Sequence, residues 1–149
     1  MEKLSREDWM VGLGGLLLFI GLLAFPWYSV SVTFDGFSRT GTATATDAPY
    51  SIWGVFALIL MIIVVLDLAI ARFSPATAIP TTQFGRDWTR VGLIAVAALF
   101  LFIKFLDDVG NFGWGFYIDV VLLVLVLTGA VLTAQGRATP MTVPTGGTR

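Results

Sequence analysis

The sequence predicts an all-α membrane protein, a four-transmembrane-helix bundle with an extracytoplasmic β-hairpin between its first and second helices. Three observations predict this fold. Of 149 residues, 56% are hydrophobic and only 13% are charged, the mean hydropathy is +0.86, and four long apolar runs follow one another along the chain. A soluble domain of this size needs more polar surface than this composition offers. The length is sufficient for one compact unit.

The four apolar runs have lengths that suit a lipid bilayer. They cover residues 9–25, 52–71, 91–106 and 116–134. A helix needs roughly 17–25 residues to cross the hydrocarbon core, so the first and third runs must borrow flanking residues. We expect residues 1–136 to form one transmembrane domain. The tail over residues 137–149 is rich in Thr, Pro and Gly, which predicts a disordered cytoplasmic segment.

The first apolar run is expected to be a retained helix and not a cleavable signal peptide. No pair of small residues that would mark a cleavage site follows it. Ser5 and Asp8 stand three residues apart just before the run, which predicts a capping box with Asp in place of Glu. Pro26 then marks the end of the helix.

The distribution of basic residues predicts the orientation. Seven Lys and Arg residues fall on the side that holds both termini: Lys3, Arg6, Arg72, Arg86, Arg90, Arg137 and Arg149. Only Arg39 and Lys104 fall on the other side. This positive-inside bias predicts a multi-pass protein of the cell membrane with its N- and C-termini in the cytoplasm. Aromatic residues near the helix ends, Trp27 among them, are expected to lie in interfacial belts.

The segment between the first two runs predicts a β-hairpin over about residues 28–46. Apolar Val30, Val32 and Phe34 alternate with hydroxyl residues, as in a strand with two different faces. Asp35 and Gly36 follow at once, and Asp-Gly is a preferred pair for a two-residue type I′ turn. An isolated hairpin is marginally stable in water. We therefore expect it to lean on the outer helix ends, on the loop over residues 111–115, or on a partner.

The composition argues against most enzyme classes. The chain has no cysteine and no histidine, which excludes thiol catalysis, a Ser-His-Asp triad and the usual protein ligands of haem, zinc and copper. No glycine-rich phosphate loop of the expected form is present. We expect no cofactor and no enzymatic activity. The net charge of −1 also offers no basic excess for nucleic acid.

Ionisable residues within the apolar helices need partners, because a charge in the membrane costs a few kcal/mol. Depth along the helices predicts two ion pairs, Asp67 with Arg90 and Lys104 with Asp119. Helical periodicity places the two basic residues on one stripe of the third helix, made of Arg90, Ile94, Ala97, Leu101 and Lys104. Lys104 could instead pair locally with Asp107 or Asp108. A competing interpretation makes Asp67 or Asp119 a proton or cation site.

The start of the chain resembles a known group of proteins. Residues 5–9 (Ser-Arg-Glu-Asp-Trp), 14–18 (Gly-Gly-Leu-Leu-Leu) and 25–28 (Phe-Pro-Trp-Tyr) are similar to the corresponding segments of uncharacterised four-helix membrane proteins of actinobacterial type. The likeness covers the first thirty residues and implies no activity. The expected topology is also similar to that of claudin-like tetraspan proteins, which have a β-rich first outer loop, but the paired cysteines and the tryptophan signature of that loop are missing here.

These observations favour a non-enzymatic function. We expect a membrane scaffold or accessory subunit that acts through lateral helix contacts and through its outer hairpin. Its partners would be the lipid bilayer and other membrane proteins or further copies of itself. The alternative is a small transporter or channel-forming homo-oligomer that uses Asp67 or Asp119.

Overall fold

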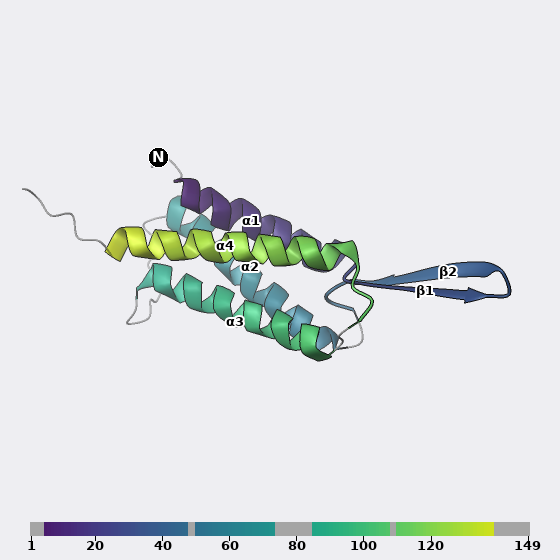
Figure 1. The fold of residues 1–149 in the computed structure, drawn as a ribbon. Coiled ribbons are helices and arrows are strands. Elements are labelled where there is room, and N and C mark those ends of the chain that lie inside the picture. The colour runs from purple at the N-terminus through teal and green to yellow at the C-terminus, as the bar shows by residue number, and fades with distance from the viewer. Residues whose placement is uncertain (1–4, 48–49, 74–84, 108–109, 139–149) are drawn as a thin grey trace, which may run out of the picture.

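The computed structural model describes residues 5–47, 50–73, 85–107 and 110–138. Within these ranges the chain forms four helices and one two-stranded antiparallel sheet: α1 (Arg6–Ala24), β1 (Tyr28–Phe34), β2 (Phe37–Ala43), α2 (Ser51–Phe73), α3 (Arg86–Asp107) and α4 (Trp114–Ala138). Figure 1 shows the helices side by side, with the hairpin standing off one end of the bundle. We call this the hairpin end. The opposite end holds the start of α1 and the end of α4.

The helices form a ring in chain order. Helix α1 packs against α2 and α4, and α3 packs against the same two helices. The core between them is apolar and includes Leu18, Met61, Ile94 and Val126, all fully buried. The buried residues of α3 are Arg90, Ile94, Ala97, Leu101 and Lys104, which confirms the predicted stripe.

The outer surface of the bundle is apolar as well. Large hydrophobic side chains are exposed on every helix, for example Leu13, Ile63, Leu99 and Val121. Soluble monomers rarely expose contiguous apolar surface on this scale. All four helices are long and apolar enough to cross a membrane. Helix α2, with 23 residues, would span roughly 35 Å at 1.5 Å per residue.

The predicted helix boundaries need small corrections. The capping box of α1 is present, because Asp8 N donates to Ser5 Oγ at 3.2 Å and Ser5 N donates to Asp8 Oδ2 at 2.9 Å. Helix α4 continues to Ala138, so the predicted tail begins too early at residue 137. The rest of that tail, residues 139–149, lies outside the described residues. Helix α3 begins at Arg86 and not near residue 91, which makes room for two arginines in its first turns.

The hairpin forms as predicted. Strands β1 and β2 pair in a register that sets Phe34 opposite Phe37 and Tyr28 opposite Ala43. Asp35 and Gly36 connect them with φ of 48° and 81°, the two positive values that a type I′ turn requires.

The base of the hairpin is fastened to the segment that precedes α4. Ser29 N donates to the Asn111 carbonyl at 2.8 Å, and Gly113 N donates to the Trp27 carbonyl at 2.7 Å. Tyr28 and Phe112 form an isolated antiparallel bridge. Of the supports expected for the hairpin, the loop over residues 111–115 is therefore one that it uses.

Candidate functional sites at the two ends of the bundle

A cluster of charges joins α2 and α3 at the opposite end. The Asp67 carboxylate accepts from Arg90 Nε at 2.5 Å through one oxygen and from Arg86 Nε at 2.8 Å through the other. Arg90 also reaches Asp87 Oδ1 at 3.1 Å. The Asp67–Arg90 contact agrees with the sequence prediction. Arg86 joins it because α3 begins earlier than expected and Arg86 lies one turn before Arg90.

A second ion pair at the same end joins α1 to α2. Arg72 Nη2 lies 2.5 Å from Asp8 Oδ2, and the Asp8 side chain is only 1% exposed. Asp8 thus serves both as the third helical residue of the α1 capping box, in which Ser5 is the N-cap, and as the partner of Arg72. The sequence prediction missed this pair, because the capping box already explained Asp8. The signal was present, since Asp8 and Arg72 lie at the same depth, each near the end of its helix.

Lys104 does not pair with Asp119, so that prediction is wrong. Lys104 is fully buried, and its Nζ donates to the carbonyl oxygens of Asp47 and Tyr50, both at 3.3 Å. It also lies 5.5 Å from the centre of the Tyr28 ring. These carbonyls belong to the connection between β2 and α2. Lys104 therefore ties the end of α3 to that connection and not to α4.

Asp47, in the same connection, is held in its charged form. Thr44 donates to its Oδ2 from the backbone N at 2.7 Å and from the hydroxyl at 2.9 Å. These hydrogen bonds lower the pKa of Asp47, and the nearby Lys104 charge adds to the effect.

Asp119 has a different partner, the indole of Trp27. Trp27 Nε1 donates to Asp119 Oδ2 at 2.5 Å, and both side chains are 1% exposed. Among the described residues, Asp119 Oδ1 has no hydrogen-bond partner. It faces Gly21 on α1 so closely that a Cβ built on Gly21 would lie 1.9 Å from it. Only glycine at position 21 leaves room for this carboxyl group.

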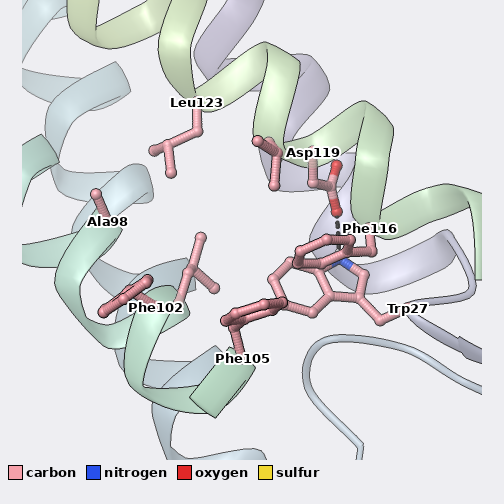
Figure 2. A pocket seen from close by; sticks show the side chains of 9 residues that line it. Trp27, Ala98, Phe102, Phe105, Phe116, Asp119 and Leu123 are labelled. Carbon is pink, nitrogen blue, oxygen red and sulfur yellow. Dashed lines mark hydrogen bonds between the residues drawn. The ribbon is translucent and has the colours of Figure 1, made fainter. Parts of the chain in front are cut away.

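A cavity of about 400 Å³ lies beside this carboxyl group, between α3 and α4. Figure 2 shows Ala98, Phe102 and Phe105 along the α3 side and Leu123 on α4, with Trp27 at one end. The Trp27 and Phe116 rings meet edge to face, with centroids 5.3 Å apart. Sequence reasoning placed Trp27 in an interfacial belt, whereas the structure buries it here.

The hairpin carries two chemically different faces. The register pairs Ser31 with Thr40 and Thr33 with Ser38 on one face, and the hydroxyls of each pair lie 3.1 Å apart. The other face, which we call the apolar face, holds Val30, Val32, Phe34, Phe37, Arg39 and Gly41. Phe34 and Phe37 are 82% and 81% exposed.

No protein-family model matches this chain, and no curated protein matches it either.

Proposed function

We propose that this chain is a multi-pass membrane protein that acts as a scaffold or accessory subunit, and that it binds a partner protein outside the membrane through the apolar face of its hairpin. The exposure of Phe34 and Phe37 at the hairpin tip is the observation that carries this proposal. Exposed aromatic side chains of this kind mark interaction sites. The proposed function involves no enzymatic reaction.

Geometry favours a protein partner over the lipid surface. Each strand has seven residues, so the hairpin extends roughly 23 Å at about 3.3 Å per residue. It points away from the helices, with its turn farthest from them (Figure 1). The tip would therefore stand well clear of the bilayer that the helices span. A two-stranded sheet is marginal alone, and a covering layer from a partner would stabilise it.

The apolar face also suggests what the partner offers. Arg39 stands opposite Val32, between the aromatic tip and the hairpin base. An arginine within an apolar contact surface pairs best with a carboxylate. The partner surface would thus be apolar with an acidic residue. Its backbone could add hydrogen bonds along the outer edge of β2, which pairs only with β1 in the described part of the chain.

The proposed orientation places both termini in the cytoplasm and the hairpin outside. It rests on the bias of seven basic residues against two. Because the chain has no cysteine, single substitutions report the orientation directly. An impermeant thiol reagent added to intact cells should label Ser38→Cys and spare Gly136→Cys. The reverse pattern would overturn the orientation.

Co-purification from native membranes tests the partner. A partner recovered at fixed stoichiometry with the unaltered chain should be lost with Phe34→Ser/Phe37→Ser. It should be retained with Ser31→Ala/Thr40→Ala, which alters only the hydroxyl face. Purified components should then reproduce the difference. Equal recovery with both double variants would contradict the proposal.

The alternative function is a small transporter or channel-forming oligomer, and one observation favours it. Asp119 is a buried carboxyl group with an oxygen that has no hydrogen-bond partner among the described residues, and such groups often belong to ion pathways. Asp67 is a weaker candidate, because two arginines bind its carboxylate. A proton-coupled flux in liposomes that Asp119→Asn abolishes, with unchanged thermal stability, would favour transport over the scaffold.

A further inference from the structure

We propose that the cavity between α3 and α4 is a lateral binding site for the hydrocarbon chain of a membrane lipid. The inference rests on the membrane placement within the proposed function and is independent of the hairpin and its partner.

The position of the cavity gives lipid chains access to it. Two of its lining residues, Phe102 on α3 and Val120 on α4, are also exposed on the outer surface of the bundle, by 55% and 41%. The cavity therefore reaches the surface at the boundary of two helices that are each apolar enough to span a membrane. Where these two helices span the membrane, the medium around the opening of the cavity consists of lipid chains.

The lining excludes water as the occupant. Eight of the nine lining residues are apolar: Trp27, Ala98, Leu101, Phe102, Phe105, Phe116, Val120 and Leu123. The ninth is Asp119, whose Oδ2 accepts from Trp27 and whose Oδ1 faces Gly21. A buried water needs two to four polar partners, and apolar cavities stay dry. A volume of about 400 Å³ would hold on the order of ten waters at roughly 30 Å³ each, with almost nothing to bind them.

An empty cavity is also unfavourable, because its lining atoms lose their dispersion contacts. A hydrocarbon chain restores those contacts and gives up only similar contacts with its neighbours in the bilayer. A helix from a second copy suits the opening less well. Helices in lipid meet through small residues, whereas the exposed residues at this opening are Phe102 and Val120.

Trp27 provides the readout, because its ring lines the cavity (Figure 2). In a variant with Trp9, Trp53, Trp88 and Trp114 replaced by Phe, Trp27 is the only tryptophan. The probe is phosphatidylcholine vesicles whose acyl chains are brominated at mid-chain, since bromine quenches tryptophan emission at short range. We expect strong quenching of Trp27 relative to vesicles without bromine, although its side chain is 1% exposed.

Two substitutions on α3 separate the cavity from the general lipid surface. Ala98→Phe should fill the cavity and remove most of the quenching. Ala95→Phe should leave it unchanged, because Ala95 is exposed and does not line the cavity. If Ala98→Phe fails to fold, Leu123→Phe narrows the same cavity from α4. Equal quenching in the filled and control variants would overturn the proposal.

A separate reporter distinguishes failure of this inference from failure of the membrane placement. Leu99, 54% exposed on α3, is changed to Trp in a chain whose five native tryptophans are replaced by Phe. Quenching at position 99 without quenching of Trp27 would overturn the lipid-chain site and leave the membrane placement intact. Absence of quenching at both would overturn both. A Val120→Cys disulfide between two copies, together with an unquenched Trp27, would assign the cavity to a second copy and overturn the lipid proposal.

Discussion

Because Trp27 and Asp119 share a hydrogen bond, their contributions to the free energy of unfolding should be coupled, and a double-mutant cycle measures that coupling. Trp27→Phe keeps an aromatic ring but removes the N–H that donates to Asp119 Oδ2. The carboxyl group then has no hydrogen-bond donor among the described residues, because Oδ1 already lacks one. Leaving a buried polar group unsatisfied costs roughly 1–3 kcal/mol, and the smaller ring costs about 1 kcal/mol more in packing. We expect a loss of about 3 kcal/mol.

The second arm of the cycle is Asp119→Val. Valine is suitable because its two methyl groups do not reach the position next to Gly21 that Asp119 Oδ1 occupies. This change leaves the buried Trp27 N–H unsatisfied and should also cost roughly 1–3 kcal/mol. Removing both partners is far less costly than the sum of the single changes, so the coupling should be about 2 kcal/mol. Thermal unfolding in detergent, followed by circular dichroism, should show it as about 4–8 °C in Tm.

Lys104→Met combined with Asp119→Val provides the control. Lys104 bonds to the Asp47 and Tyr50 carbonyls and not to Asp119, so these two losses should add within about 0.5 kcal/mol. Additive losses for Trp27 and Asp119, together with coupling between Lys104 and Asp119, would refute this account and restore the ion pair expected from the sequence.

Three further changes have expected outcomes. Gly21→Ala places a Cβ within 1.9 Å of Asp119 Oδ1 and should lower stability in detergent by about 1–3 kcal/mol through overpacking; an unchanged Tm would show that α1 and α4 separate easily. Gly36→Val forces a β-branched residue to φ of 81° and should speed hydrogen exchange of the strand amides. Gly41→Val, within β2 and with open space around it, should not, because residue 41 does not adopt a positive φ. Arg72→Leu leaves the Asp8 carboxylate, 1% exposed, without this ion pair and should cost about 3 kcal/mol in thermal unfolding; a loss below about 1 kcal/mol would mean that the pair is effectively solvated.

Much of the fold could be predicted from local patterns. Hydrophobic run length located the four helices, and Asp35-Gly36 between alternating residues fixed the hairpin register. Depth along the helices sufficed for Asp67 and Arg90, because the long Arg90 side chain reaches the Asp67 carboxylate on the adjacent helix at the same level. At the end of the bundle opposite the hairpin, charge and depth together left few possible partners for Asp67.

The same reasoning failed at the hairpin end. Depth along the helices matched Lys104 to Asp119. Depth alone does not show that a loop covers the end of a helix and offers its backbone carbonyls to the side chains there. The carbonyls of Asp47 and Tyr50 bind Lys104 in place of the Asp119 carboxylate. The actual donor to Asp119 is Trp27, a neutral residue whose sequence position resembled that of an interfacial anchor. Only the packing of Trp27, which directly precedes β1, against α4 brings its indole N–H to the Asp119 carboxyl group.

The two arginines on Asp67 should contribute unequally, although both bind the same carboxylate. The Arg90 side chain is 5% exposed and also bonds Asp87, whereas Arg86 is 23% exposed and bonds Asp67 alone among the acidic side chains of the described residues. Arg90→Leu therefore leaves two acids without a buried cation and should cost about 3 kcal/mol. Arg86→Leu removes a partly solvated contact and should cost about 1 kcal/mol or less. Raising the salt concentration should shrink the loss for Arg86→Leu more than the loss for Arg90→Leu, because water and ions screen the exposed pair more strongly. Equal losses with equal salt dependence, measured by thermal unfolding in detergent, would mean that the number of neighbouring cations stabilises the Asp67 carboxylate, and not the burial of Arg90.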